Sequence, residues 1–177
     1  MKTFLLKNNK VLQIRQGVPN DVTAFIDFVN TCAGQSDFLT FNPGDFGKTA
    51  EECNTIEEFL ANNKDLYLIG EIDGQIIANL VFRPGKRIKT AHAGEFGITI
   101  RKDYWGLGIG QFLIQQLIEW ARATNIIRKI DLRVHINNQR GINLYKKMGF
   151  QQEGVLKREF CINGIFYDEI IMGLCID

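Results

Sequence analysis

The stretch Tyr104-Trp105-Gly106-Leu107-Gly108-Ile109-Gly110-Gln111 decides the fold. Residues 95–100, directly before it, alternate polar and apolar side chains with the period of two that is typical of a strand. Residues 111–121, directly after it, repeat apolar side chains at helical spacing. The glycines therefore lie in a strand-to-helix turn. Glycine lets a ligand approach the backbone closely, and the free N–H groups of a helix start favour an anion, most often a phosphate.

The spacing of the glycines excludes two common nucleotide-binding motifs. A dinucleotide-binding Gly-x-Gly-x-x-Gly motif that starts at Gly106 needs a third glycine where Gln111 stands, and one that starts at Gly108 needs it where Leu113 stands. A P-loop needs a Gly-Lys-Ser/Thr triplet, and none follows. On this window alone, a glycine-rich turn without a ligand remains the alternative.

Composition is that of an ordinary globular protein, with 45% hydrophobic and 23% charged residues. The length of 177 residues predicts a single domain that spans residues 1–177. A formal net charge of +1 gives no reason to expect nucleic acid or a membrane as partner. The first residues have too short an apolar core for a signal peptide. The four cysteines are scattered, which favours reduced thiols in a cytoplasmic protein: Cys32, Cys53, Cys161 and Cys175.

The rest of the chain predicts alternating strands and helices. Strands are expected at 11–15, 66–72, 75–82, 130–136, 152–161 and 166–174, and helices at 22–31 and 139–148. A short helix is expected to open at a capping box from Thr55, with an earlier helical turn around Glu51 and Glu52 as the alternative. Asp73-Gly74 and Asn163-Gly164 mark tight hairpin turns. Asp21 is the expected N-cap of the first helix. The strand at 130–136 completes a strand–helix–strand crossover, so it should run parallel to the strand at 95–100.

An aromatic loop at residues 35–47 carries Phe38, Phe41 and Phe46. Such a loop either packs against the core or forms the rim of a substrate site, and the sequence leaves both open. Phe38 and Phe41 are candidate substrate-binding residues. Asp168 in the last strand is another candidate, with a structural role in an edge strand as its alternative.

Two motifs at opposite ends of the crossover resemble those of a known superfamily. Residues 105–110 look like an Arg/Gln-x-x-Gly-x-Gly/Ala pyrophosphate loop, and residues 138–150 look like an Asn-x-x-Ala-x-x-x-Tyr-x-x-x-Gly-Phe segment. Together with the order of elements, they resemble the GNAT superfamily of acetyl-CoA-dependent N-acetyltransferases. The resemblance implies an α/β fold in which a central, mostly antiparallel sheet splays at one parallel pair, with helices on both faces. It also implies a possible homodimer.

The resemblance also implies a set of coenzyme-binding residues. Backbone N–H groups of the turn would hold the pyrophosphate, those of the preceding strand would pair with the pantetheine arm and polarise the thioester, and Asn138 would hold the arm by its amide. These residues are Ile98, Thr99, Ile100, Trp105, Gly106, Leu107, Gly108, Ile109, Gly110, Gln111 and Asn138. Trp105 departs from the family's Arg or Gln, so the phosphates would depend on the main chain. Gly141 replaces the usual Ala.

Two residue types suit the chemistry of acetyl transfer to an amine. An acceptor ammonium must lose a proton before its nitrogen attacks, and Glu95 is the candidate base because it lies on the polar side of its strand. Tyr145 matches the family's general acid, which would protonate the departing coenzyme A thiolate. The alternatives are a surface glutamate and a core tyrosine.

These features predict an acyltransferase that moves an acetyl group from acetyl-CoA to a primary amine by direct attack in a ternary complex. A non-catalytic acyl-CoA-binding or regulatory domain is the alternative. The acceptor stays open among a small metabolite, an antibiotic, a polyamine and a protein N-terminus. No metal is expected, because His92 and His135 lack metal-ligand spacing and His135 alternates on the polar side of its strand. Without a histidine at recognisable spacing, a cysteine nucleophile is not expected either.

Overall fold

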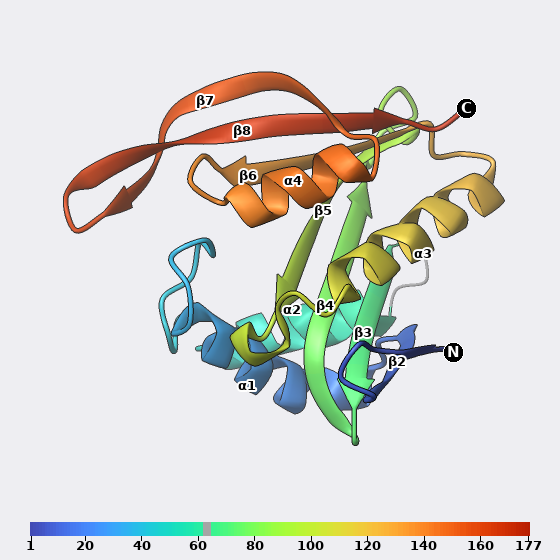
Figure 1. The fold of residues 1–177 in the computed structure, drawn as a ribbon, viewed down its shortest axis with the longest axis vertical. Coiled ribbons are helices and arrows are strands. Elements are labelled where there is room, and N and C mark those ends of the chain that lie inside the picture. The colour runs from blue at the N-terminus through green and yellow to red at the C-terminus, as the bar shows by residue number, and fades with distance from the viewer. Residues whose placement is uncertain (62–64) are drawn as a thin grey trace. The chain divides into compact units, whose positions relative to one another are not determined.

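A computed structural model describes residues 1–61 and 65–177. It shows a mixed α/β protein whose eight strands follow the order β1-β2-β3-β4-β5-β6-β8-β7 in one sheet (Figure 1). The strands are β1 (Lys2–Leu5), β2 (Val11–Gln16), β3 (Leu66–Ile72), β4 (Gln75–Pro84), β5 (Ala93–Ile100), β6 (Lys129–His135), β7 (Gln151–Ile162) and β8 (Ile165–Cys175). The helices are α1 (Val22–Ala33), α2 (Ala50–Ala61), α3 (Ile109–Thr124) and α4 (Gln139–Lys147), with short 3-10 turns at Pro19–Asp21 and Lys102–Tyr104. The predicted fold class is confirmed.

The chain forms two compact units, and each is drawn from two separate segments. The first unit comprises residues 1–81 and 98–113, and the second comprises residues 82–97 and 114–177. Strands β4 and β5 and helix α3 each contribute residues to both units. The prediction of one domain over residues 1–177 stays a prediction.

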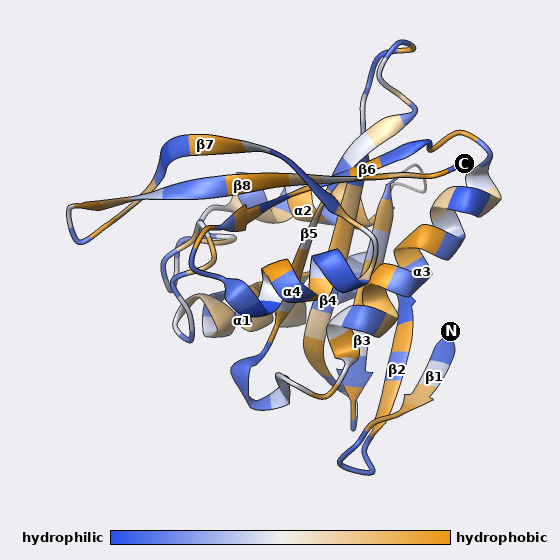
Figure 2. Ribbon diagram, turned by 45° about the horizontal axis from the view of Figure 1, so that its top comes forward, coloured by the Kyte–Doolittle hydropathy of each residue, from blue (hydrophilic) through white to orange (hydrophobic). Residues whose placement is uncertain are grey.

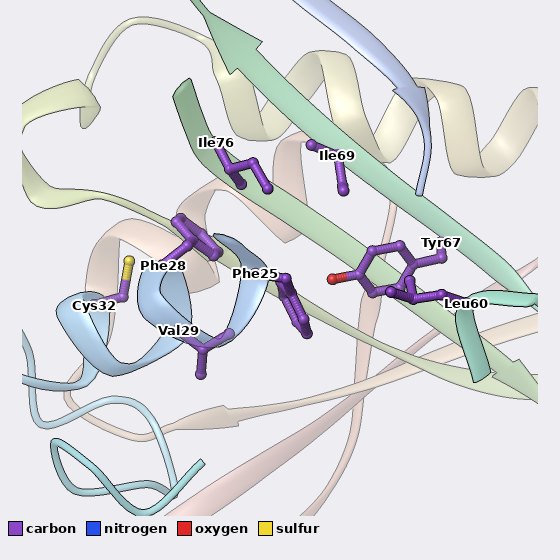
Figure 3. Packing of buried hydrophobic residues seen from close by; sticks show 8 residues of the cluster. All are labelled: Phe25, Phe28, Val29, Cys32, Leu60, Tyr67, Ile69 and Ile76. Atoms are coloured by element: carbon purple, nitrogen blue, oxygen red, sulfur yellow. The ribbon is translucent and has the colours of Figure 1, made fainter. Parts of the chain in front are cut away.

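Aromatic packing between α1 and β3 builds the core of the first unit. The cluster in Figure 3 consists of Phe25, Phe28, Val29, Cys32, Leu60, Tyr67, Ile69 and Ile76. The four residues of α1 recur at helical spacing, so they line one side of the helix. The ring of Phe25 meets the ring of Tyr67 edge-on, with centroids 5.1 Å apart and an interplanar angle of 86°. The amphipathic helix predicted at 22–31 is therefore confirmed and extends to Ala33.

Helix α4 covers the apolar side of the strands in the second unit. On β6 the alternating residues Ile130, Leu132 and Val134 are buried, as the period of two predicts. Tyr145 of α4 and the following Phe150 both pack against Phe96 of β5, with ring centroids 5.9 and 5.6 Å from it. Figure 2 shows hydrophobic and hydrophilic bands recurring along α3, in agreement with its predicted periodicity. The apolar residues of β6 are therefore buried as their pattern predicts, and so are Leu117 and Ala121 of α3.

Both hairpin turns are confirmed by their backbone angles. Asp73 and Gly74 have φ values of 53° and 75°, and Asn163 and Gly164 have 51° and 79°, which is the left-handed pair that a type I′ turn requires. Helix α4 ends before Gly149, whose φ is 95°, as predicted. The strand β1 was not predicted; it pairs antiparallel with β2 from Lys2↔Ile14 to Leu5↔Val11.

One predicted helix start is wrong, and the predicted N-cap residue Asp21 occupies its position without making the cap hydrogen bond. Helix α2 begins at Ala50 rather than at Thr55, because Thr49 and Glu52 form the capping box: Thr49 Oγ1 accepts from Glu52 N at 3.2 Å, and Glu52 Oε2 accepts from Thr49 N at 3.3 Å. Asp21 precedes α1 but makes no side-chain cap. Its carboxylate instead accepts from Val18 N at 2.8 Å and from Arg15.

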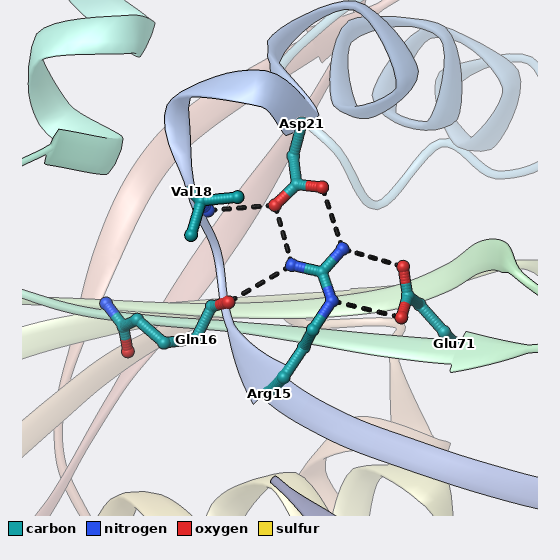
Figure 4. A network of polar contacts seen from close by, with 5 residues as sticks. All are labelled: Arg15, Gln16, Val18, Asp21 and Glu71. Atoms are coloured by element: carbon teal, nitrogen blue, oxygen red, sulfur yellow. Dashed lines mark hydrogen bonds and ion pairs between the residues drawn. The ribbon is translucent and has the colours of Figure 1, made fainter.

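Arg15 joins the first helix entry to the sheet (Figure 4). Its Nη1 and Nη2 atoms donate to both carboxylate oxygens of Asp21 at 2.7 Å, and its Nε and Nη2 atoms donate to Glu71 of β3 at 3.0 and 2.7 Å. The three side chains are mostly buried. The hydrogen bonds from Arg15, together with the one from Val18, lower the pKa of Asp21.

We expect Arg15→Met to lower the free energy of unfolding by about 2 kcal/mol at pH 7, because it leaves Asp21 and Glu71 without their shared donor. A carboxyl whose pKa is lowered by folding stabilises the protein above its unfolded pKa of about 3.9, and that stabilisation is lost as the pH falls. The difference in free energy of unfolding between Arg15→Met and the unsubstituted protein should therefore shrink below about pH 4. Urea titrations at several pH values measure this, and a difference that is constant with pH contradicts the role given to Asp21.

Candidate active site

The glycine turn has the backbone conformation that its sequence predicts. Gly106 and Gly108 have φ values of 82° and 88°, in the left-handed region that favours glycine, and α3 begins at Ile109. A Cβ atom on Gly106 would have no heavy atom within 4 Å, so the main chain lies open at this point. The first N–H groups of α3 have no partner within the helix. An open main chain followed by a helix start suits an anion such as pyrophosphate.

Trp105 positions the turn through its own hydrogen bond. Its indole Nε1 donates to the carbonyl of Ile100, at the end of β5, with a distance of 2.7 Å. The indole N–H is therefore committed to the chain, and phosphate binding by the main chain of residues 106–111 stays a prediction. The sequence predicted that Trp105 could not replace an arginine, but it gave no sign of this contact.

Strands β5 and β6 pair over only a short length. Their parallel ladder joins Ala93 to Lys129, Gly94 to Ile130 and Glu95 to Asp131. Among the described residues of the second unit, Phe96 and Gly97 extend β5 beyond that point without pairing to β6. The rest of β6 pairs with β8 alone. The splay that the family resemblance implied, and that the sequence did not show, begins directly after Glu95.

Glu95 occupies the last paired position of this ladder. Its Oε2 accepts from Arg133 Nε at 3.1 Å, and the two side chains are 51% and 46% exposed. An ion pair so exposed contributes little to stability, about 0–1 kcal/mol. The pair fixes the direction of the Glu95 carboxylate while leaving it open to solvent. Arg133 was not predicted as a site residue, although its place on the polar side of 130–136 was visible in the sequence.

Tyr145 lies on the opposite side of β5 from Glu95. Its ring is buried and meets Phe96, the residue after Glu95, edge-on at 82°. Within residues 1–61 and 65–177 its hydroxyl makes no hydrogen bond. Burial raises the pKa of Tyr145, so the phenol stays protonated at neutral pH. The second unit thus brings the predicted base and the predicted acid to adjacent positions of one strand, on its two faces.

Asn138 caps α4. Its side-chain Oδ1 accepts from Gly141 N at 3.0 Å, which satisfies one N–H of the first helical turn. The Gly141 that departs from the family pattern lies against this cap, since a Cβ on Gly141 would stand 2.9 Å from Asn138 Nδ2. The Oδ1 atom of Asn138 is therefore occupied by the helix cap.

The aromatic loop is held to α1 by Asn30. Its Nδ2 donates to Phe46 O at 2.9 Å, and its Oδ1 accepts from Gly44 N at 2.8 Å. Phe46 packs on Phe25, with centroids 5.4 Å apart, so this part of the loop belongs to the core. Phe41 contacts Phe46 but remains 39% exposed, and Phe38 is half-buried. The loop therefore packs against the core through Phe46 and keeps the ring of Phe41 exposed, while a substrate-rim role for Phe38 and Phe41 stays a prediction.

Asp168 holds an irregularity in the last hairpin. The register of β7 and β8 shifts between Leu156 and Phe160, where Arg158 has a φ of 59°. Asp168 Oδ1 accepts from Arg158 N at 3.0 Å, and its Oδ2 accepts from Lys157 Nζ at 2.8 Å. The hydrogen bonds from Lys157 and from Arg158 N lower the pKa of Asp168. Both oxygens thus have structural partners in the hairpin.

His135 lies on the same side of β6 as Asp131 and Arg133, as the alternation predicts, but this side is not exposed at His135. His135 is buried, because Phe160 of β7 and Tyr167 of β8 cover it with ring centroids at 5.0 Å. Its neighbour across the strands, Glu169, is also buried. Strand periodicity assigns a side but does not reveal that a neighbouring hairpin covers it.

Residues 1–61 and 65–177 contain neither a metal-binding group nor a membrane-spanning helix. His, Cys, Asp and Glu side chains form no group of three or more that could hold a metal ion. None of the helices combines the length and the hydrophobicity needed to span a bilayer. All four cysteines are free.

Comparison with known proteins places this geometry in a family. The family model described as "Acetyltransferase (GNAT) family" matches residues 35–150. The chain belongs to the GNAT family. The L-amino acid N-acetyltransferase of Escherichia coli K12 is 28% identical over 132 residues, which cover 68% of this chain and 82% of that protein. The spermidine N(1)-acetyltransferase of Vibrio cholerae is 34% identical over 76 residues, covering 43% and 44%.

Solved GNAT structures share the fold. The crystal structure of a GNAT-family acetyltransferase from Streptococcus pneumoniae is 32% identical, with a TM-score of 0.87 over 93% of this chain and 99% of that one. The GNAT assignment makes this protein an acyltransferase that uses acetyl-CoA as its cosubstrate. The open glycine turn at the start of α3 fits the phosphates of that cosubstrate.

We expect Gly108→Val to raise the KM for acetyl-CoA about tenfold or more, because a β-branched residue at a φ of 88° costs about 1–3 kcal/mol of backbone strain. Gly74→Val is the matched control, since Gly74 has a φ of 75° and equally open surroundings in a distant turn. Trp105→Phe, which removes the hydrogen bond to Ile100 and leaves the main chain of the turn unsubstituted, should cost less affinity than Gly108→Val. Initial rates give the KM for acetyl-CoA of the three variants, and calorimetry gives their affinity for it. Unchanged affinity in Gly108→Val contradicts the role of the turn.

Proposed function

We propose that this GNAT enzyme transfers the acetyl group of acetyl-CoA to a primary amine by direct attack in a ternary complex. The observation that carries the proposal is the end of the β5–β6 ladder, which puts Glu95 on one side of the strand and Tyr145 on the other. The relatives named for an L-amino acid and for spermidine support an amine as the acceptor. Small amines and peptide N-termini both satisfy this chemistry.

Glu95 is the group that removes a proton from the acceptor, directly or through one water molecule. An alkylammonium ion has a pKa near ~10, so its nitrogen carries no free electron pair at neutral pH until a base takes the proton. Glu95 is exposed enough to meet such an ion, and Arg133 holds its carboxylate in one direction. Orientation by a second side chain is what a general base needs in order to act on one particular proton.

Tyr145 is the group that protonates the leaving thiolate. When bound, acetyl-CoA supplies the thioester that the acceptor nitrogen attacks. The Tyr145 hydroxyl has no hydrogen bond within the described chain and its pKa is raised by burial, so it keeps a proton to donate. A phenol without a partner in the folded protein is available to a sulfur atom that arrives with the ligand.

The glycine turn and Asn138 bind the rest of the coenzyme in this proposal. The main chain of residues 106–111 takes the pyrophosphate, the backbone of residues 98–100 pairs with the pantetheine arm, and the amide nitrogen of Asn138 donates to it while Oδ1 caps α4. Phe38 and Phe41 are proposed rim residues for the acceptor, on the strength of the exposure of Phe41.

We expect Asn138→Ala to lower the free energy of unfolding by about 1 kcal/mol, because the cap of α4 is lost. Asn138→Asp keeps an oxygen for the Gly141 N–H but has no amide donor. It should therefore recover the stability without recovering the KM for acetyl-CoA. Thermal unfolding and initial rates separate the two effects. If Asn138→Asp restores both quantities, the residue caps the helix and does nothing else.

We expect Glu95→Gln to lower kcat/KM for an amine on the order of a hundredfold at pH 7, with recovery as the pH rises and the free amine becomes abundant. Tyr145→Phe keeps the packing on Phe96 and should lower kcat about tenfold to a hundredfold, with little change in the KM for acetyl-CoA. Glu58→Gln, an exposed change of equal charge on α2, is the control. Thiol release measures all of these rates.

Two results count against the proposal in different ways. Full turnover in both Glu95→Gln and Tyr145→Phe removes these residues from the mechanism. Acetyl-CoA binding without amine-dependent thiol release across a broad amine panel supports the non-catalytic alternative.

A further inference from the structure

The Glu169 side chain is mostly buried in the last hairpin of the second unit. It lies in the middle of β8, opposite His135 of β6 and Leu156 of β7, and only 8% of its surface is exposed. Within residues 1–61 and 65–177, its carboxylate makes no hydrogen bond and no ion pair. A buried charged group ordinarily has such partners, because its removal from water is otherwise uncompensated. The Glu169 oxygens are not among the side-chain atoms that are shut off from solvent without a partner, so a ligand on this face can reach the carboxylate.

The nearest charged neighbours of Glu169 lie on one face of the strands in the second unit. Residues directly opposite in paired strands share a face, so Glu169 faces the same side as His135, and hence as Arg133, two residues earlier on β6. Arg133 contacts Glu95 of β5 at 3.1 Å and Glu159 of β7 at 4.0 Å. Burial raises the pKa of Glu169, Arg133 lowers it, and Glu159 and Glu95 raise it.

The remaining polar groups near Glu169 have other roles. His135 is covered by the rings of Phe160 and Tyr167. Asp168, the preceding residue, is bound to Lys157 and to the backbone of Arg158. The groups that set the charge around Glu169 are therefore Glu95 from β5, Arg133 from β6 and Glu159 from β7.

The charge balance of these residues favours a cation. Three carboxylates surround one guanidinium, and two of them already lie against it. The side chains of Glu95, Arg133 and Glu159 are 51%, 46% and 45% exposed, so the cluster is open to solvent although Glu169 is mostly buried. An ammonium ion would compensate the surplus negative charge and give Glu169 its missing hydrogen bond. A ligand carboxylate would instead compete with Glu95 and Glu159 for Arg133 and repel all three acids.

We propose that Glu169 is an acceptor-binding residue, and that with Glu95 and Glu159 it selects amines that carry no carboxylate beside the reacting nitrogen. This inference rests on the proposed function, since it assigns the substrate class of that same site. Glu169 draws the ammonium group of the acceptor onto the face where Glu95 lies. Simple alkylamines and polyamines fit the cluster, and free α-amino acids do not.

The test compares acceptors that differ only by a carboxylate. The first pair is agmatine and L-arginine, and the second is 2-phenylethylamine and L-phenylalanine. Thiol release is measured for the unsubstituted enzyme, for Glu169→Gln and for Glu58→Gln as the exposed control. We expect each decarboxylated amine to exceed its amino acid in kcat/KM about tenfold or more. Glu169→Gln should raise the KM of the amines about tenfold and leave acetyl-CoA affinity unchanged. It should also lower the ratio of kcat/KM between each amine and its amino acid.

The pH dependence gives a readout that a structural role would not change. Because a carboxyl group with a raised pKa must ionise to bind an ammonium ion, the KM of the amine should fall as the pH rises through that pKa in the unsubstituted enzyme. Glu169→Gln should lose this part of the profile, whereas Glu58→Gln should keep it.

The possible failures are distinguishable. If acetyl-CoA binds but no amine of a broad panel releases thiol, the proposed function fails. If amines are acetylated but the amino acids react equally well, or if Glu169→Gln leaves the KM and its pH profile unchanged, this inference is overturned while the proposed function stands. It is equally overturned if other amines are acetylated and neither agmatine nor 2-phenylethylamine reacts or competes. Should Glu169→Gln fold poorly, the two matched pairs on the unsubstituted enzyme decide the substrate class.

Discussion

The early end of the β5–β6 ladder is the constraint on which the chemistry of the second unit depends. A parallel pair that continued beyond Glu95–Asp131 would commit the backbone of β5 to its neighbour. Because the ladder stops there, Glu95 stands at the point where the strands part, and the next residue, Phe96, receives the ring of Tyr145 from the other side. The alternation along β5 and the packing of α4 on it thus bring the proposed base Glu95 and the proposed acid Tyr145 to opposite faces of one strand.

The polar groups of the protein fall into two classes. Arg15, Asp21 and Glu71 satisfy one another completely and bind the entry of α1 to the sheet. The Tyr145 hydroxyl and the Glu169 carboxylate, both in the second unit, have no hydrogen-bond partner in the described chain. Groups that satisfy each other stabilise the fold, and groups left unsatisfied in a buried position cost stability, which is typical of sites that a ligand completes.

The hairpin of β7 and β8 shows how one irregularity serves the site. The shift in register between Leu156 and Phe160 is held by Asp168, which binds Lys157 and the backbone of Arg158. Past the shift, Phe160 covers His135, while Glu159 lies beside Arg133. Between the pairs Leu156–Glu169 and Phe160–Tyr167, β7 has two more residues than β8. In a regular hairpin Arg158, not Phe160, would lie opposite Tyr167, so the charge around Glu169 depends on this bulge.

The sequence by itself determined the elements and the family, because these follow from local spacing. The period of two at 95–100, the glycines at 106, 108 and 110 and the segment 138–150 each act within a few residues of chain, and the Asp-Gly and Asn-Gly turns need only their own backbone. Only the tertiary structure decided the length of the β5–β6 ladder, the Trp105–Ile100 bond, the burial of His135 and the isolation of Glu169. Each of these depends on which distant strand or hairpin comes to lie beside the residue, and a periodic pattern contains no information about such neighbours.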